Sequence, residues 1–304
     1  MKISDRQQLA LKSLIGTSIG DAFGDSFFGD TKEALDYIEN RLVPPTKWEF
    51  TDDTVMSIAI YKQLILNSKI DQDKLALEFS RLHDIDPNRG YGAGARSVLR
   101  DISNGEHWRI ISSESFEGMG SMGNGASMRV SCIGAYHFDD LDKVIKLAKQ
   151  SAEITHMNLE GISGAIAVAI AAAISVQYSK KSIQLEPNEF LSLISKYVPE
   201  SDTRSKILKG ISIPYSYNIE TVRAALGDGT KILAQDTVPF SLWCAAHNLA
   251  NYEEALWKAV SILGDRDTIC AIVGGIVILS APEETIPPKW SESIEKLNSS
   301  PFWN

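Results

Sequence analysis

Two short acidic segments carry the residue types best suited to chemistry. They are Thr51-Asp52-Asp53-Thr54, directly before the apolar stretch 55–66, and Asp265-Arg266-Asp267-Thr268, directly before the apolar stretch 269–277. Carboxylates beside an apolar core are costly unless something neutralises their charge. Carboxylate and hydroxyl oxygens are ligands that Mg²⁺ prefers, and two such groups can hold a pair of cations. The two segments together therefore indicate a metal site built from oxygens.

A plainer interpretation of these segments stays open. Asp and Thr are preferred at helix N-caps and in first turns, so each segment could simply begin a helix, with Arg266 offsetting part of the charge of the second one. The other metal-binding residue types show no pattern. Three cysteines lie far apart without C-x-x-C spacing, and the five histidines include no H-x-x-x-H or H-E-x-x-H pair. We expect the cysteines to be small core residues.

Two glycine-rich segments lie between the acidic ones and could bind phosphate groups. They are Arg89-Gly90-Tyr91-Gly92-Ala93-Gly94 and the run 118–129, which ends in Gly123-Asn124-Gly125-Ala126-Ser127-Met128-Arg129. Glycine lets a backbone approach a ligand closely, and successive N–H groups can cradle a diphosphate. Each segment alone is more typical of a turn. Thr155-His156 at a predicted helix end is a further candidate, although an isolated histidine is more often a surface or packed residue.

Composition and charge exclude several classes of protein. The chain has 304 residues, of which 44% are hydrophobic and 23% charged, as in ordinary globular proteins. Thirty Lys and Arg against 39 Asp and Glu leave a formal charge of −9, which disfavours general nucleic-acid binding. The polar start shows no secretory signal, and the longest apolar stretch, 162–176, is too short to span a bilayer. We therefore expect a cytoplasmic protein without a membrane partner, in which 162–176 is a buried helix.

The elements that must position these residues are helices. Apolar residues recur at helical spacing almost everywhere, and period-2 alternation is nearly absent. We predict helices over about 5–20, 51–67, 72–83, 140–156, 160–178, 188–197, 219–226, 237–249, 251–263 and 267–280. Long connections are expected at 24–50, 84–94, 118–125 and 211–236, and Pro287-Pro288 is expected to end the last core helix. No repeat or linker divides the chain, so we predict one all-α domain over residues 1–304.

These landmarks, in this order, resemble the ADP-ribosylglycohydrolase family. Gly16-Thr17-Ser18-Ile19-Gly20-Asp21-Ala22-Phe23-Gly24 is similar to the family's opening G-x-x-x-G-D-A-x-G helix, whose small residues suit close packing. The T-D-D-T, G-N-G-x-x-M-R and D-x-D-T segments follow it, and the resemblance runs from Gly16 to about Trp290. It implies a compact orthogonal multi-helix bundle. It also implies that the partner is ADP-ribose or a mono-ADP-ribosylated protein, and that a cognate ADP-ribosyltransferase could belong to the same system.

The resemblance also implies a role for each matching residue. Two Mg²⁺ or Mn²⁺ ions would be held by Thr51, Asp52, Asp53, Asp265, Asp267 and Thr268. The ADP-ribosyl group would be bound by Gly92, Gly94, Gly123, Asn124, Gly125, Ser127, Met128 and His156. Asp53 and Asp265 are the carboxylates expected nearest to the reacting water, and we assign them the catalytic role.

Three positions depart from the family pattern. Phe28 stands where the family commonly has a glutamate close to the metal ions, so Asp25 or Asp30 would have to supply an acid from a shifted loop. Asn158 stands in place of a second histidine, and Leu263 in place of a glycine before the D-x-D-T segment. Neither of these last two changes removes a proposed metal ligand.

Three functions are compatible with these residues. The first is a metal-dependent hydrolase that cleaves the C1'' glycosidic bond of mono-ADP-ribosylated side chains, arginine before others, or of a related conjugate. The alternative is a catalytically impaired ADP-ribose-binding or regulatory protein, because of Phe28. A metal-dependent phosphoesterase would use paired aspartates as well, but it would attack phosphorus and release AMP.

Overall fold

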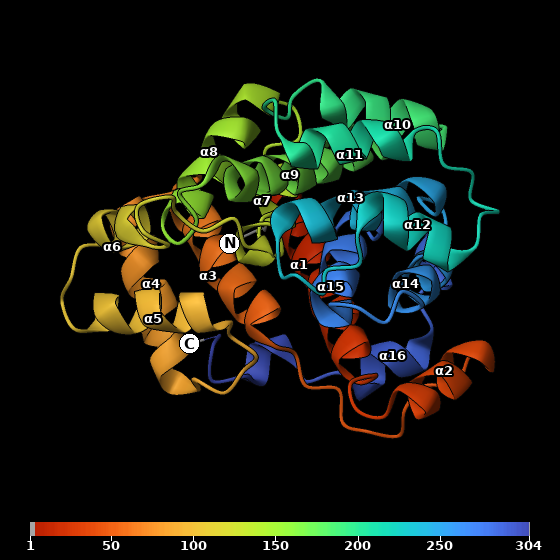
Figure 1. The fold of residues 1–304 in the computed structure, drawn as a ribbon, viewed down its shortest axis with the longest axis horizontal. Coiled ribbons are helices and arrows are strands. Elements are labelled where there is room, and N and C mark those ends of the chain that lie inside the picture. The colour runs from red at the N-terminus through yellow and green to blue at the C-terminus, as the bar shows by residue number, and fades with distance from the viewer. Residues whose placement is uncertain (1–3, 304) are drawn as a thin grey trace.

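The computed structural model describes residues 4–303 and is built from helices (Figure 1). In chain order they are α1 (Asp5–Asp25), α2 (Thr31–Glu39), α3 (Asp52–Asn67), α4 (Gln72–Ile85), α5 (Ala93–Ser103), α6 (Trp108–Glu114), α7 (Ser131–Tyr136), α8 (Leu141–Glu153), α9 (Leu159–Lys180), α10 (Pro187–Ser195), α11 (Asp202–Gly210), α12 (Ile219–Leu226), α13 (Ala234–His247), α14 (Tyr252–Val260), α15 (Arg266–Val277) and α16 (Pro288–Ser293). Short 3-10 turns occur at Asn124–Ala126, Glu283–Thr285 and Leu297–Ser299. Within residues 4–303 there is no β-strand, only two isolated bridges. The predicted all-α fold is confirmed.

Helices α1 and α15 form the centre of the fold, side by side although they lie far apart in the sequence (Figure 1). Gly16, Gly20 and Gly24 of α1 face the backbone of α15. A Cβ on Gly20 would lie 2.0 Å from the carbonyl oxygen of Cys270, and one on Gly24 would lie 2.2 Å from that of Arg266. Any side chain here would force the helices apart. The glycines therefore set the distance between the N-terminal motif and the second acidic segment.

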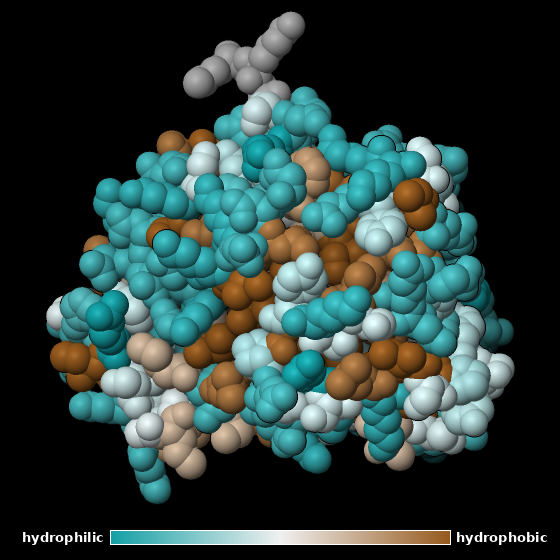
Figure 2. All heavy atoms as spheres, turned by 90° about the horizontal axis from the view of Figure 1, so that it is seen from above, coloured by the Kyte–Doolittle hydropathy of each residue, from teal (hydrophilic) through white to brown (hydrophobic). Residues whose placement is uncertain are grey.

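Helix α9 is the second element of the core. The sequence prediction that its apolar stretch is too short to span a bilayer was wrong, because the helix extends from Leu159 to Lys180 and is long and apolar enough by length and composition. However, 83% of its most apolar window is buried inside the protein. Residues 161–176 are all buried. Seen from above the view of Figure 1, the surface is mostly hydrophilic, and hydrophobic residues gather in a central band (Figure 2). The buried helix predicted over 162–176 is confirmed.

Several short helices lie where the sequence did not predict them. Helix α2 falls inside the predicted connection 24–50, and α5, α6, α7 and α11 were not predicted either. They have between 6 and 11 residues, too few turns for a clear apolar period. The prediction for Pro287-Pro288 was wrong as well. Helix α15 has already ended at Val277, and Pro288 begins α16, where its missing N–H is no loss.

The close approach of α1 to α15 predicts that Gly20→Ala destabilises the protein. The new methyl group would collide with the Cys270 carbonyl, so we expect the free energy of unfolding to fall by about 1–3 kcal/mol. Urea unfolding followed by circular dichroism measures this change. Gly92→Ala is the matched control, because a Cβ there would have no neighbour within 4 Å and φ is −63°. A Gly20→Ala protein as stable as this control would contradict the contact.

Candidate active site

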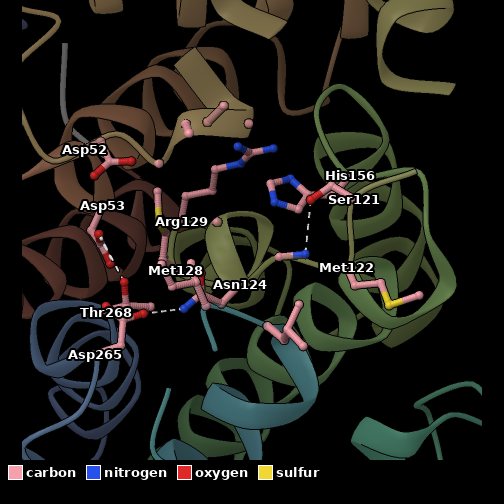
Figure 3. Close-up of a pocket in the computed structure, with 18 of the residues that line it drawn as sticks. Asp52, Asp53, Ser121, Met122, Asn124, Met128, Arg129, His156, Asp265 and Thr268 are labelled. Atoms are coloured by element: carbon pink, nitrogen blue, oxygen red, sulfur yellow. Dashed lines mark hydrogen bonds between the residues drawn. The ribbon is translucent and has the colours of Figure 1, made fainter. Parts of the chain in front are cut away.

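A cavity of about 400 Å³ opens where the starts of α3 and α15 meet the glycine-rich segments (Figure 3). Twelve predicted site residues line it: Asp52, Asp53, Gly92, Gly94, Gly123, Asn124, Gly125, Met128, His156, Asp265, Asp267 and Thr268. They come from segments up to about two hundred residues apart in the chain. The fold therefore assembles most of the predicted residues around one cavity.

The start of α3 is tied to α1 through Asp21. Thr51 accepts a hydrogen bond from the N–H of Asp53, so the predicted N-cap is confirmed. The N–H and the hydroxyl of Thr51 donate to Asp21 at 2.9 and 2.8 Å, and those of Thr54 do so at 3.1 and 2.6 Å. Thr51 is buried and does not line the cavity, whereas Asp52 and Asp53 do. The threonines thus hold the helix end, and the aspartates face the cavity.

The start of α15 supplies the second group of oxygens. Asn124 donates from Nδ2 to Asp265 Oδ2 and also, at 2.9 Å, to Thr237 Oγ1. Thr268 Oγ1 donates to Asp53 Oδ2 at 3.5 Å, so the two acidic segments meet (Figure 3). The glycine-rich loop, α3 and α15 are therefore joined by hydrogen bonds at the acidic end of the cavity.

Burial of neighbouring carboxylates dominates the electrostatics of this end. The pKa values of Asp52, Asp53 and Asp265 are raised well above the usual value, first by burial and then by the charges of adjacent carboxylates. Burial also raises the pKa of Asp21 to about 7, although the hydrogen bonds that it accepts favour its ionised form. A positive charge beside these oxygens would lower the cost of ionising them.

Two buried oxygens of this cluster, Asp53 Oδ1 and Asp267 Oδ1, have no hydrogen-bond partner among residues 4–303. A buried polar atom without a partner is costly, and an oxygen-only donor set is what a hard divalent cation requires. The residues present therefore fit such a cation. Within residues 4–303 no three His, Cys, Asp or Glu side chains form a ready-made metal-binding group, so further oxygens such as the Thr268 hydroxyl and water would have to complete the coordination.

The loop 120–125 folds closely over His156. A Cβ on Gly123 would lie 2.8 Å from His156 Nε2, and one on Gly125 would lie 3.2 Å from Cε1. Gly120 has φ +70°, and its Cβ would lie 2.7 Å from the backbone nitrogen of Asn158. Larger residues would strike the histidine or the start of α9. The glycines therefore serve close packing as well as access for a ligand.

Arg129 and His156 give the cavity a second end of opposite character (Figure 3). Arg129 is 1% exposed, its guanidinium lies 4.5 Å from the centre of the Phe79 ring, and no ion pair to a carboxylate of the described chain involves it. Burial lowers the pKa of Arg129 to about 9, while the charge of Asp52 acts to raise it. Arg129 is therefore a buried cation at neutral pH. The cavity has carboxylates at one end, and a cation with an imidazole at the other.

Ser127 is the predicted substrate-binding residue that does not line the cavity. Its hydroxyl is buried and lies against α9, where a Cβ on Gly164 would come within 2.4 Å of Oγ. Its Oγ has no hydrogen-bond partner in the described chain. The side chain of Ser127 thus packs behind the loop.

Some residues of the site were not named as site residues from the sequence, although Met119 lies within the glycine-rich run 118–129. Phe116, Met119 and Ile232 line the cavity and are 57%, 61% and 58% exposed. Phe116 and Ile232 have φ of 55°, a conformation rare for residues with a Cβ, and no sequence pattern indicated it. Asp21 could have been found from the sequence, because it lies inside the glycine motif of α1. However, that motif was interpreted as a helix-packing motif, and the carboxylate that binds the start of α3 was not predicted.

Phe28 lies outside the cavity, half exposed, with its ring 4.6 Å from the guanidinium carbon of Arg266. Asp30 caps α2 by accepting hydrogen bonds from two backbone N–H groups, so it is occupied elsewhere. The pKa of Asp25 is raised to about 6, first by burial and then by the charge of Asp267. Of the two acids considered as substitutes for the missing glutamate, Asp25 is the one close enough to interact with the carboxylate cluster.

Comparison with known proteins decides which family this site belongs to. The family model described as ADP-ribosylglycohydrolase matches residues 2–301. The chain belongs to the ADP-ribosylglycohydrolase family. The resemblance stated from the motifs is thereby confirmed, and the family acts on ADP-ribosylated substrates.

Individual relatives agree with this assignment. The "ADP-ribosylhydrolase ARH3" of Xenopus tropicalis is 27% identical over 328 residues, which cover 96% of this chain and 92% of that protein. The protein of that name from Homo sapiens is 29% identical over 280 residues, covering 81% and 74%. A solved structure described as "ADP-ribosylglycohydrolase-related protein complex" matches with a TM-score of 0.68 and 20% identity, covering 96% of this chain and 93% of that one. The last comparison shows the fold, and the predicted fold class is confirmed.

The raised pKa values predict that the metal-free protein loses stability as the pH rises from about 7 to about 8.5. A buried acid with a raised pKa binds more protons folded than unfolded between its unfolded-state value, about 4, and its folded-state value, so its contribution is lost progressively across that interval. Asp21, with a pKa of about 7, has lost most of its contribution by pH 7, whereas Asp52, Asp53 and Asp265, whose pKa values are raised well above the usual value, carry the loss at higher pH. Buried His137 and His156, whose pKa values are lowered to about 4 and 3, are largely neutral in both states above about pH 7 and do not add to the change.

Thermal unfolding in the presence of a chelator measures this dependence, and we expect the higher Tm at the lower pH. Asp53→Asn, which removes one of the acids that carry the loss above pH 7, should reduce it. The same Tm at both pH values in the unaltered protein would contradict the electrostatic account.

Proposed function

We propose that this protein is a metal-dependent hydrolase that cleaves the C1'' glycosidic bond of mono-ADP-ribosylated protein side chains and releases ADP-ribose. The observation that carries the proposal is the two-ended cavity. Carboxylates from α3 and α15 lie at one end, and Arg129, His156 and the glycine loop at the other. An ADP-ribosyl group offers ribose hydroxyls to the first end and a diphosphate to the second. Family membership supports the same class of substrate.

We further propose that the acidic end holds two Mg²⁺ or Mn²⁺ ions. The residues that would hold them are Thr51, Asp52, Asp53, Asp265, Asp267 and Thr268. The unpartnered oxygens of Asp53 and Asp267 support this proposal, whereas the hydroxyl of Thr51 is engaged by Asp21 and is the least available of the set. Bound divalent cations would polarise ribose hydroxyls and lower the pKa of a water molecule.

Asp53 and Asp265 are the proposed catalytic residues. A carboxylate whose pKa is raised accepts a proton from water more readily than an ordinary one, which suits a general base. Asn124 holds one oxygen of Asp265, and Thr268 contacts one oxygen of Asp53. The transition state of glycoside hydrolysis carries positive charge at the anomeric carbon, and nearby carboxylates stabilise that charge.

The opposite end suits the diphosphate. Gly125 lines the cavity beside His156, and the N–H groups of a glycine-rich loop can cradle a diphosphate. Arg129 contributes a buried positive charge behind this loop. In a cavity of low dielectric, one cation without a carboxylate partner attracts an anionic ligand strongly.

Quantification of free ADP-ribose tests the reaction. Substrates with arginine-, serine- and cysteine-linked mono-ADP-ribose, incubated with Mg²⁺, should release ADP-ribose from at least one linkage. Asp265→Asn should lower kcat/KM by about 100-fold or more, because it removes a proposed base. Asp139→Asn is the matched control: this partly exposed carboxylate pairs with Arg6 and does not line the cavity, so the rate should be unchanged.

The other outcomes are equally informative. Release of AMP would favour the phosphoesterase. Binding of ADP-ribose without release from any linkage would favour the catalytically impaired binding protein, and the position of Phe28 is the observation behind that alternative. At the sequence position where the family has a glutamate, the ring of Phe28 packs against the guanidinium group of Arg266. That position therefore supplies no carboxylate.

Metal binding has a readout that does not depend on activity. Because a ligand that binds only the folded state stabilises it, Mg²⁺ or Mn²⁺ at 100 times its Kd should add about 2.7 kcal/mol to the free energy of unfolding. Thermal unfolding with and without the metal should show a rise in Tm for the unaltered protein and for Asp139→Asn. Asp53→Asn should lose that rise. If neither metal changes the Tm of the unaltered protein, the metal proposal is wrong.

A further inference from the structure

Arginine is rarely buried, and the hydrogen bonds of buried Arg129 indicate a specific role for it. Its Nη2 donates to the carbonyl oxygen of Ser151 at 2.7 Å and to Thr155 Oγ1 at 3.0 Å. Its Nη1 contacts the sulfur of Met56 at 3.5 Å. A guanidinium has only donors, so the oxygen of Thr155 must accept in this pair. Arg129 therefore makes Thr155 Oγ1 a hydrogen-bond acceptor on this side.

The orientation of the Thr155 hydroxyl in turn determines how His156 is hydrogen-bonded. Thr155 Oγ1 lies 2.7 Å from His156 Nδ1, and both residues are buried. The hydroxyl hydrogen of Thr155 has no other hydrogen-bond acceptor within residues 4–303, so it is donated to Nδ1. A ring nitrogen that accepts a hydrogen bond carries no proton. In a neutral imidazole the proton is then on Nε2.

The imidazole is neutral at physiological pH. Burial, followed by the charge of Arg129, lowers the pKa of His156 to about 3. Nε2 faces the loop at Gly123 and Gly125, borders the cavity and has no hydrogen-bond partner within residues 4–303. One N–H group of fixed orientation is thus available to a ligand.

We infer that Thr155, held by Arg129, is a positioning residue that keeps His156 in the tautomer with its proton on Nε2. The cavity then offers a neutral donor at this point and no acceptor. It selects an oxygen that accepts a hydrogen bond, such as a phosphate oxygen, and disfavours a hydroxyl or amine that must donate. The tautomer follows from the protein alone, whereas its use toward the diphosphate rests on the proposed function.

Nuclear magnetic resonance of histidine-labelled protein tests the tautomer without ligand or metal. Long-range ¹H–¹⁵N correlations, assigned to His156 by their loss in His156→Gln, should show one tautomer in the unaltered protein, protonated at Nε2. Thr155→Val has nearly the same shape but lacks the hydroxyl, so a fraction protonated at Nδ1 should appear. Thr155→Ser restores the hydroxyl and should restore the single tautomer. A proton on Nδ1 in the unaltered protein, or an unchanged spectrum in Thr155→Val, would overturn the inference.

A binding measurement separates this inference from the proposed function. By isothermal titration calorimetry, Thr155→Val should raise the Kd of ADP-ribose by the inverse of the fraction that keeps its proton on Nε2 in the spectra, because only that tautomer offers the donor, and Thr155→Ser should bind normally. If no form of the protein binds ADP-ribose, the proposed function fails while the spectra still decide the tautomer. If ADP-ribose binds equally well to Thr155→Val, the role of this donor in binding is refuted.

Discussion

Carboxylates from three helices share one buried volume, and the rest of the structure must sustain their repulsion. Burying one ion costs several kcal/mol even after relaxation, whereas a whole domain is stable by only about 5–15 kcal/mol. Asp21 offsets its cost through the hydrogen bonds from Thr51 and Thr54. Asp53 and Asp267 each keep an oxygen without a hydrogen-bond partner in the part of the chain that the structure describes. The fold therefore holds an acidic cluster that protons or cations must complete.

The helices around this cluster pack closely because glycines let their backbones come into contact. The glycines of α1 bring its backbone against that of α15, and the buried α9 supports the glycine loop from below through Gly161 and Gly164. Residues that start two different helices can therefore meet within hydrogen-bond distance, as Asp53 and Thr268 do. The same arrangement separates Arg129 and His156 from the carboxylates, so one cavity has two electrostatic characters.

Much of this arrangement was predictable, because the informative residues are local signals. Thr51 before two aspartates and an apolar run predicts a helix start, and the structure has it. The D-x-D-T segment likewise begins α15. The class of fold followed from helical periodicity, and the grouping of distant segments followed from the resemblance to a family. The short helix α2 was missed because 9 residues on the surface need only one buried residue, Ala34, and so leave almost no apolar pattern.

Other features depend on tertiary contacts that no local pattern encodes. The direction in which Ser127 points is decided by the proximity of Gly164. Phe116 and Ile232 reach the rim through backbone conformations that glycine usually adopts, although neither is a glycine. The link from Arg129 to His156 runs through residues 26 positions apart and then through a neighbour in sequence, and only the fold brings Arg129 to Thr155.

The contact between α1 and α15 has a consequence for how this family can vary. At Gly16, Gly20 and Gly24 one helix meets the main chain of the other: the atoms closest to the missing Cβ groups include carbonyl oxygens of residues 274, 270 and 266. A main-chain atom cannot be made smaller by mutation. No compensating substitution on α15 can then rescue a larger residue on α1, so these glycines should stay constant among relatives without any correlated partner position. Methods that infer contacts from correlated substitutions would therefore not detect the contact between α1 and α15, which positions the site.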